Sequence, residues 1–341
     1  MFKKKYHKRS SNPFFVIFRL LLSLIMLSLL IGGVYTAYKH FSGLDPLKLD
    51  PQSILKNVLK TRSPQQLLSV LSSIKLPQGL SKEDKKDLPA GRQVLGQSVP
   101  SKYVFRFLVI ADSENDNTNL QKAIAQAKAN YPDVSFIVGL GDYTSVGTIE
   151  ELKKSKIELD SSGLRYFLIP GDHDLWDSRN RSLPATSDFT QVFGPNFQSF
   201  TFQNYRFLLV DNSDDYQGLG EKQLSWITTE LEKAKSDNVS GILLFIAQPL
   251  YHPSSDHVMG KVDKDLKKQA RSLIFQSKDF GVKMIFAGDT HYFSQYTEPE
   301  SKLEMMTVGA LTLDRNPQAP RFAVVYVFED ASIKVEDVEI K

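Results

Sequence analysis

Six apolar runs, each rich in β-branched or aromatic residues, restrict the fold of this chain more than any other feature. The runs are YVFRFLVIAD, VSFIVGLGD, RYFLIPGD, FQSFTFQNYRFLLVDN, GILLFIAQP and VKMIFAGD, between residues 103 and 289. Helical spacing of apolar residues occurs between them, at residues 119–129, 149–159, 221–235 and 263–280. Strands that alternate with helices predict an α/β domain, which we assign to residues 101–341. The last apolar segments, residues 303–312 and 321–340, predict further strands in antiparallel pairing.

The polar residues that end these runs indicate a site. Five of the six runs end in Asp, Gly-Asp or Gln-Pro. Ligands in open α/β sheets bind at the carboxyl ends of the strands. We therefore expect five strand ends to meet at one site, namely those that carry Asp112, Asp142, Asp172, Gln248 and Asp289.

Composition excludes several classes of protein and of site. The chain has no cysteine, so disulfides are excluded and any metal ion must be bound by oxygen and imidazole groups. With 341 residues, 41% of them hydrophobic, the chain can bury a large core, which excludes a disordered protein. Its 42 basic and 39 acidic residues give a net charge of +3, so the overall charge does not indicate nucleic-acid binding.

The first residues predict a membrane anchor. Residues 20–38 carry no charge, and Phe14 to Phe18 extend this apolar segment, so residues 14–38 predict one transmembrane helix. The basic tail of residues 1–13 favours a cytoplasmic N-terminus, which places the following domain on the outer side of the cell membrane behind an uncleaved signal-anchor. A cleavable signal peptide is the alternative, although residues 32–40 offer no good cleavage site.

Residues 39–100 predict a stalk or linker. They contain six prolines, the charged stretch SKEDKKD and only short apolar segments. A short helix is expected within residues 63–74, where Leu67, Leu71 and Ile74 share one face. Three partners fit that face: a second copy of the chain, the membrane surface, or the chain's own domain.

Five short stretches occur in the order of a known signature. They are IADSE, GLGDYTSVG, PGDHD, FIAQPLYHP and AGDTH, and VDNS followed by GLGEKQLSWITTELEKA precedes the fourth. In this order they resemble the motifs of the calcineurin-like metallophosphoesterase family, which are Asp-x-His, Gly-Asp, Gly-Asn-His-Asp or Glu, a lone His, and Gly-His-x-His. The resemblance implies an α/β fold of the four-layer α-β-β-α sandwich type. It also implies a metal-dependent hydrolase of phosphate mono- or diesters.

The resemblance carries over residue by residue, with substitutions. The family residues are kept at Asp112, at Asp142, at His173 with its following Asp174, and at His291. Other donors stand at four positions, with Glu114 in place of a His, Asp172 in place of an Asn, Gln248 in place of a His, and Asp289 in place of a His.

The family arrangement implies a role for each of these side chains. One divalent ion would be bound by Asp112, Glu114, Asp142 and His291, and a second by Asp142, Asp172, Gln248 and Asp289. A water or hydroxide between the two ions would be the nucleophile, and His173 would donate a proton to the leaving oxygen. Asp174 would either orient His173 or cap the following turn.

Every substituted ligand is an oxygen donor, which indicates retained cation binding. Carboxylate and amide oxygens suit manganese, magnesium and calcium, whereas imidazole suits iron and zinc. We therefore expect two divalent ions, with manganese or magnesium favoured over iron or zinc. His252, four residues after Gln248, is an alternative nitrogen ligand. His257 is expected in a surface loop, within reach of a substrate.

The number of carboxylates raises a question of charge. Five carboxylates against two divalent ions leave about −1, whereas the two carboxylates of the family pattern leave about +2 to attract a phosphate. A nearby base, for which Arg179, Arg181 and Arg315 are the candidates, or a protonated acid would restore the attraction. Without either, the alternative function is a non-catalytic cation-binding or interaction module on the same fold.

Overall fold

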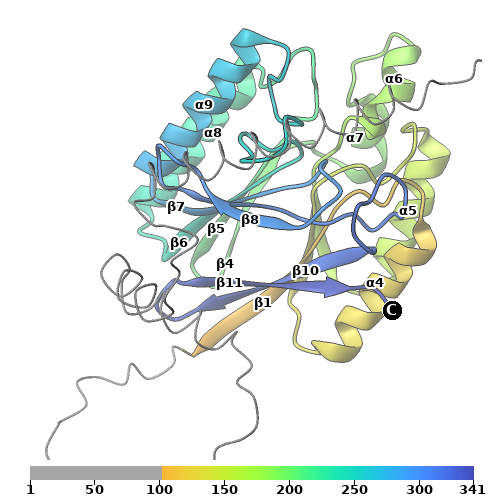
Figure 1. Cartoon of the computed structure of the whole chain (residues 1–341), viewed down its shortest axis with the longest axis horizontal. Helices are drawn as coiled ribbons and strands as arrows, with labels where there is room; N and C mark the ends of the chain where they lie inside the picture. The colour runs from red at the N-terminus through yellow and green to blue at the C-terminus, as the bar shows by residue number, and fades with distance from the viewer. Residues whose placement is uncertain (1–101) are drawn as a thin grey trace, which may run out of the picture. The chain divides into compact units, whose positions relative to one another are not determined.

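The computed structural model describes residues 102–341 (Figure 1). The predicted basic tail, transmembrane helix and stalk of residues 1–13, 14–38 and 39–100 lie outside the described residues. Within residues 102–341, no helix combines the length and the apolar character needed to cross a bilayer.

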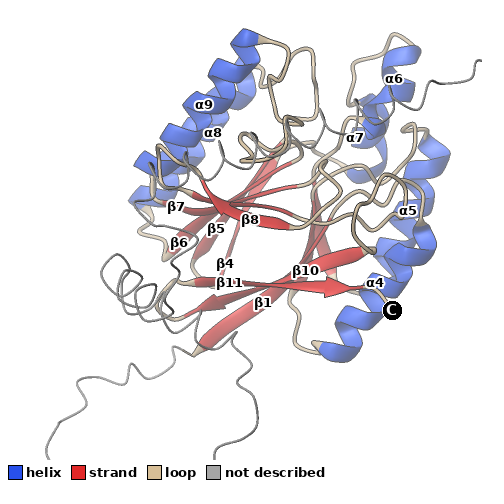
Figure 2. Ribbon diagram, viewed as in Figure 1, coloured by secondary structure: helices blue, strands red, loops and turns tan. Residues whose placement is uncertain are grey.

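Two β-sheets form the centre of the domain (Figure 2). The first has the strand order β11-β10-β1-β2-β3, with β1 at Tyr103–Ile110, β2 at Phe136–Gly139, β3 at Arg165–Leu168, β10 at Arg321–Phe328 and β11 at Ile333–Glu339. The second has the order β4-β5-β6-β7-β9-β8, with β4 at Gln198–Phe202, β5 at Tyr205–Val210, β6 at Gly241–Ile246, β7 at Val282–Ala287, β8 at Ser294–Thr297 and β9 at Glu304–Thr307. Strands β1 to β3 are parallel, as are β5, β6, β7 and β9. The carboxyl ends of parallel neighbours therefore lie at one edge of each sheet.

The two sheets pack face to face through aromatic side chains. Along β1, Phe105, Phe107 and Val109 belong to the core between the sheets, whereas Leu108 and Ile110 pack against helices. This alternation follows from the two-residue period of a strand. Fully buried phenylalanines come from both sheets, and the rings of Phe245 and Phe286 stack with centroids 4.8 Å apart. A strand buried on both faces must be apolar throughout, which explains the continuous runs in the sequence.

Helices cover the outer faces of the sheets (Figure 1). Helices α4 (Asn117–Asn130), α5 (Ile149–Ser161) and α7 (Ser187–Phe193) contribute buried residues to the core of the first sheet. Helices α8 (Glu221–Ser236) and α9 (Lys264–Asp279) cover the second sheet. Asp116, Thr148 and Asp263 cap the amino ends of α4, α5 and α9, so polar residues define where these helices begin. The predicted α/β fold with two sheets is confirmed.

Some elements differ from the prediction. Strands β10 and β11 form the expected antiparallel pair, but β9 pairs in parallel with β7 and antiparallel only with β8. Three short helical segments were not predicted, namely η2 (His173–Leu175), α6 (Trp176–Asn180) and α7. Each has at most seven residues, which is too short for a helical period to show in the sequence.

Candidate metal centre

Loops from both sheets meet at the carboxyl ends of the strands. The loop after β1 is bonded to the loop after β2, since the backbone N–H of Asp112 donates to Gly141 O (3.1 Å) and that of Glu114 to Asp142 O (2.9 Å). The loop after β7 joins them because the N–H of Asp289 donates to both carboxylate oxygens of Asp112, at 3.0 and 3.2 Å. The backbone thus brings the predicted strand ends together.

Glycine permits the closest of these approaches. A Cβ atom at Gly171 would overlap the carboxylate of Asp142, so the loop after β3 reaches Asp142 only with glycine at this position. Gly141, with φ of +106°, lies against the backbone of Gly171 in the same way.

Five of the predicted site residues have a left-handed backbone. Their φ angles are 53° for Asp112, 41° for Glu114, 54° for Asp142, 68° for Asp289 and 61° for His291. Non-glycine residues rarely adopt this conformation, which costs on the order of 1 kcal/mol per residue, and such residues concentrate at functional sites. The strain therefore coincides with the residues that the sequence singled out.

Asp142, Asp172 and Asp289 form a group that we call the acid cluster. One carboxylate oxygen of each lies within 4.8 Å of the others. Burial, and then the charge of neighbouring carboxylates, raises the pKa of Asp142 and of Asp172. Oδ2 of Asp289 is buried, and Nε2 of the exposed His257 lies 3.0 Å from it. Crowded carboxylates with a buried oxygen fit a divalent cation of the magnesium or manganese kind.

Asp112 lies behind this cluster and is fully buried. Burial raises its pKa to about 7, although the nearby charge of His291 acts in the opposite direction. Its two oxygens accept the hydrogen bonds from the backbone of Asp289 described above. Asp112 thus holds the loop that carries Asp289.

Glu114 is surrounded by cationic groups. Its Oε1 is in contact with Nη2 of Arg315 and lies 3.4 Å from Nε2 of His291 and 3.8 Å from Nε2 of His173. Burial would raise the pKa of Glu114, but the hydrogen bond from His291 and the charges of His291 and Arg315 lower it. Burial would likewise lower the pKa of His291, but Glu114 and Asp112 raise it to about 9.

His173 is fixed on two sides. Its Nδ1 lies 2.9 Å from the carbonyl oxygen of Ser145, and its ring stacks on Trp176 with centroids 4.0 Å apart. A carbonyl oxygen only accepts, so Nδ1 must carry the hydrogen. Nε2 is then the nitrogen that can exchange a proton, and it lies 3.3 Å from Nη2 of Arg315.

Asp174 does not contact the ring of His173, which corrects the expectation that it orients this ring in a catalytic role. The buried carboxylate accepts hydrogen bonds from the N–H of Gly171 (3.0 Å), the N–H of Thr144 (3.1 Å) and Oγ1 of Thr144 (2.7 Å). Burial outweighs these bonds and raises its pKa to about 6. Asp174 therefore ties together the loops after β2 and β3, and the Ser145 carbonyl orients His173.

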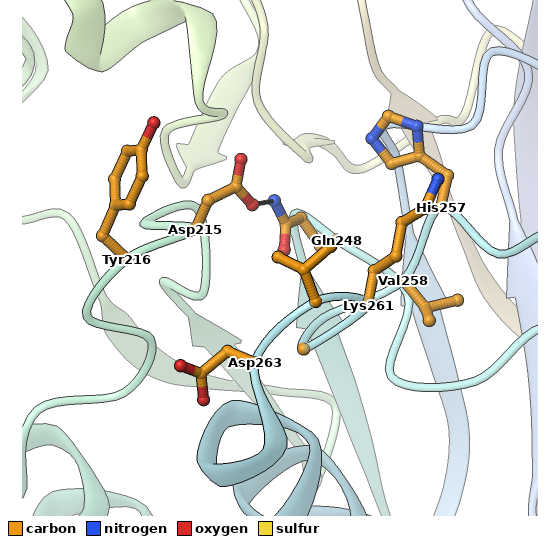
Figure 3. Close-up of a pocket in the computed structure, with 9 residues that line it drawn as sticks. Asp215, Tyr216, Gln248, His257, Val258, Lys261 and Asp263 are labelled. Carbon is orange, nitrogen blue, oxygen red and sulfur yellow. Dashed lines mark hydrogen bonds between the residues drawn. The ribbon is translucent and has the colours of Figure 1, made fainter.

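Gln248 lies at the end of β6, where it lines a pocket of about 360 Å³ (Figure 3). Its side-chain amide nitrogen donates to Asp215, and its backbone is held by Asn212, whose Oδ1 accepts the N–H of Gln248 at 3.0 Å. The side chain of His252, the alternative ligand, contacts Ser255 and two tyrosines. Its Nδ1 accepts the N–H of Ser255 at 2.9 Å, and its ring packs edge-on against Tyr292 and Tyr296.

The sequence did not indicate a definite position for two residues that reach this site, His257 and Arg315. His257, expected in a surface loop, reaches Asp289, and this contact raises the pKa of His257. Among the three candidate arginines only Arg315 contacts a predicted site residue, because Arg179 pairs with Asp214 (3.1 Å) and Arg181 with Asp177 (2.8 Å) and Asp188.

Asp215, which contacts Gln248, was not identified from the sequence. It lies in a loop without helical or strand spacing, so no sequence signal pointed to it.

Comparisons with known proteins agree with this geometry. A family model described as calcineurin-like phosphoesterase matches residues 105–293, more than half of the chain. A curated protein of Arcobacter nitrofigilis, named a probable glycerophosphodiester phosphodiesterase GpdQ, is 28% identical over 132 residues, which are 37% of this chain and 46% of that protein. The chain thus matches about half the length of this relative.

A solved structure shows the same fold. Purple acid phosphatase PPD1 from yellow lupin (Lupinus luteus) seeds aligns with 71% of this chain and 52% of its own length, with a TM-score of 0.53. At 12% sequence identity, this similarity concerns the fold alone.

Proposed function

Because the chain belongs to the calcineurin-like phosphoesterase family, we propose that it is a metal-dependent hydrolase of phosphate mono- or diesters. The observation that carries this proposal is the acid cluster, whose Asp172 precedes His173 in the loop after β3. The name of the Arcobacter relative, a phosphodiesterase, supports diesters as substrates.

The acid cluster would bind the cation. Its ligands are carboxylate oxygens, so we propose manganese or magnesium, with calcium as a third choice. A divalent cation in such a site supplies Lewis-acid polarisation of a phosphoryl oxygen and lowers the pKa of water. Asp142 also accepts the backbone N–H of His173 at 2.9 Å, so the same carboxylate positions both the cation site and the histidine.

His173 would be the proton donor for the leaving oxygen. The Ser145 carbonyl fixes Nδ1 as the protonated nitrogen, so Nε2 faces the site and transfers the proton. Glu114, 3.8 Å from Nε2, stabilises the ring when it is positively charged. Trp176 limits the rotation of the ring by stacking on it.

The pocket beside the acid cluster would receive the alcohol part of the ester. His257 lines this pocket and also contacts Asp289, which connects the pocket to the acid cluster (Figure 3). Tyr216 and Val262 are 83% and 92% exposed, so they offer apolar surface to a ligand. Lys261 lines the same pocket, where its ammonium group pairs with Asp256 at 3.0 Å.

The test is turnover by the purified chain. With manganese, p-nitrophenyl phosphate and bis(p-nitrophenyl) phosphate report monoesterase and diesterase activity. His173→Ala should lower kcat by roughly 10²- to 10⁴-fold, the contribution of a general acid, while Arg271→Ala on the surface of α9 should leave it unchanged. If the unaltered chain turns over neither substrate faster than His173→Ala, the proposed hydrolase activity is wrong.

A non-catalytic cation-binding module is the second candidate function. It is favoured because Glu114 already contacts Arg315 and lies 3.4 Å from Nε2 of His291. These contacts leave the carboxylate of Glu114 little capacity to bind a metal ion. Manganese binding that depends on Asp142, without turnover of either ester, would support this function over hydrolysis.

We also propose that residues 14–38 anchor the chain in the cell membrane, with the domain on the outer side. This placement rests on the charge-free segment and the basic tail before it. Protease added to intact cells should remove the domain; full protection of the domain would count against the outer location. Self-association through the stalk stays a prediction.

A further inference from the structure

We infer that Arg315 occupies the place of one of the two metal ions, so that the chain binds a single divalent cation, at the acid cluster. This inference rests on the proposed metal-dependent function and changes the predicted number of ions from two to one. The guanidinium would supply, as part of the chain, the positive charge that a second ion supplies elsewhere in the family.

The two predicted sets of metal ligands differ in the cationic side chains that contact them. In residues 102–341, the acid cluster is the one group of three or more acidic or histidine side chains whose ligand atoms all lie within 4.8 Å of one another. The side chain of Asp289 is 9% exposed. The one ion pair of this set joins Asp289 to the exposed His257, whose Nε2 lies 3.0 Å from Oδ2, and within the described residues no ion pair involves Asp142 or Asp172.

The other set already has a cationic partner from outside the set, Arg315. Oε1 of Glu114 contacts Nη2 of Arg315 and lies 3.4 Å from Nε2 of His291. Both oxygens of Asp112 accept the N–H of Asp289. An ion bound to Glu114 would have to displace the guanidinium or lie beside it, and two like charges on one carboxylate repel each other strongly.

The backbone holds Arg315 at this position. Its own φ is 50°, and the N–H of Thr312, in the same loop, donates to the backbone oxygen of Asp112 at 3.0 Å. The carbonyl of Asp314 lies 2.9 Å from Nδ1 of His291, and Asn316 closes the loop by donating to Thr312 O at 2.8 Å. The loop that carries Arg315 is thus bonded to two residues of the set it would complete.

Arg315 also has donors left for a substrate. A guanidinium has five N–H groups and keeps its charge at every physiological pH. Nη2 contacts Glu114 and Nε2 of His173, Nε lies 3.4 Å from Oδ2 of Asp314, and the side chain is 56% exposed. Nη1 keeps both of its N–H groups, so Arg315 would donate to the substrate phosphate through this nitrogen.

The decisive measurement is the number of manganese ions bound by the chelator-treated full chain in detergent. Equilibrium dialysis with metal analysis counts the ions, and calorimetry gives the affinity of each. We expect one ion in the unaltered chain and two in Arg315→Ala, because Oε1 of Glu114 then loses its guanidinium partner and can bind the second ion beside Asp112 and His291. Arg271→Ala is the matched control, since Arg271 is 59% exposed and also pairs with a glutamate, Glu300; it should bind one ion.

Two further variants complete the test. Asp289→Asn should lose the single ion, and Arg315→Gln, which keeps most of the stem but not the charge, should repeat the result of Arg315→Ala if the alanine variant misfolds. Two ions in the unaltered chain, or one ion in both Arg315 variants, would overturn the inference and leave the proposed hydrolase intact. No bound ion in the unaltered chain would overturn the metal-dependent function itself.

Discussion

Removing divalent cations should make the stability of the domain fall as the pH rises. Asp112 has an ordinary pKa of 3.8, and burial raises it to about 7 in the folded chain. A raised folded pKa contributes stability that is fully present below pH 3.8 and is lost as the pH rises through about 7. His291, raised from 6.5 to about 9, acts in the same direction over a higher range. Glu114 acts in the opposite direction, but its lowered pKa matters only below its ordinary value of 4.5.

The magnitude follows from the size of the shift. The rise of the pKa of Asp112 from 3.8 to about 7 is worth at most about 4 kcal/mol, of which about 3 kcal/mol is lost between pH 5 and pH 8. Asp112 is fully buried, so solvent screening does not reduce this value. A saturating divalent cation should offset the loss, because it binds the deprotonated carboxylates of the acid cluster and stabilises the folded chain by about 2.7 kcal/mol at 100 times its Kd.

Urea unfolding followed by tryptophan fluorescence measures this effect. Both tryptophans of the chain, Trp176 and Trp226, lie in the domain, so the signal reports the domain even in the full chain. The free energy of unfolding is measured from pH 5 to pH 8 with a chelator and again with excess manganese. Asp112→Asn is the control, since it removes the titration of Asp112 and should make the chelator curve less steep, while His291 and the other buried carboxylates keep their contributions. A metal-free domain that is as stable at pH 8 as at pH 5 would refute the reasoning.

Two further predictions concern the loops that hold the site. Gly171→Ala should weaken manganese binding by at least about tenfold in calorimetry, because the added Cβ overlaps the carboxylate of Asp142, whereas Gly220→Ala, with open space around it, should bind normally. Equal affinities of the two variants would contradict the tight packing of the loop after β3. Asp174→Ala should destabilise the domain by about 3 kcal/mol in urea unfolding, because it leaves the buried N–H groups of Gly171 and Thr144 without acceptors. A loss of kcat at unchanged stability would instead indicate that Asp174 acts in catalysis.

The sheet and the strand ends were predictable because they depend on long patterns. Continuous apolar runs, such as the one that becomes β6, are fully buried on both faces, and burial of this kind shows directly in composition. Helix α5 begins at Ile149, as predicted, because Thr148 and Glu151 form a capping box.

The contacts of single loop residues were not predictable. His257 and Arg315 reach the site from loops whose path depends on tertiary hydrogen bonds, and no local spacing encodes such a path. For a related reason the sequence left two roles open for Asp174, orienting His173 or capping the following turn. Its neighbour in sequence, His173, is not its partner in space, because the short helix η2 turns the two side chains to different sides.

The acid cluster joins the two sheets, since Asp142 and Asp172 follow strands of the first sheet and Asp289 follows a strand of the second. Packing of the phenylalanine core favours contact between the sheets, whereas repulsion between the carboxylates opposes it at this one edge. The edge is thus a local conflict in an otherwise consistent fold. A divalent cation bound by the three carboxylates would remove their repulsion, so it would stabilise the edge at which the two sheets meet.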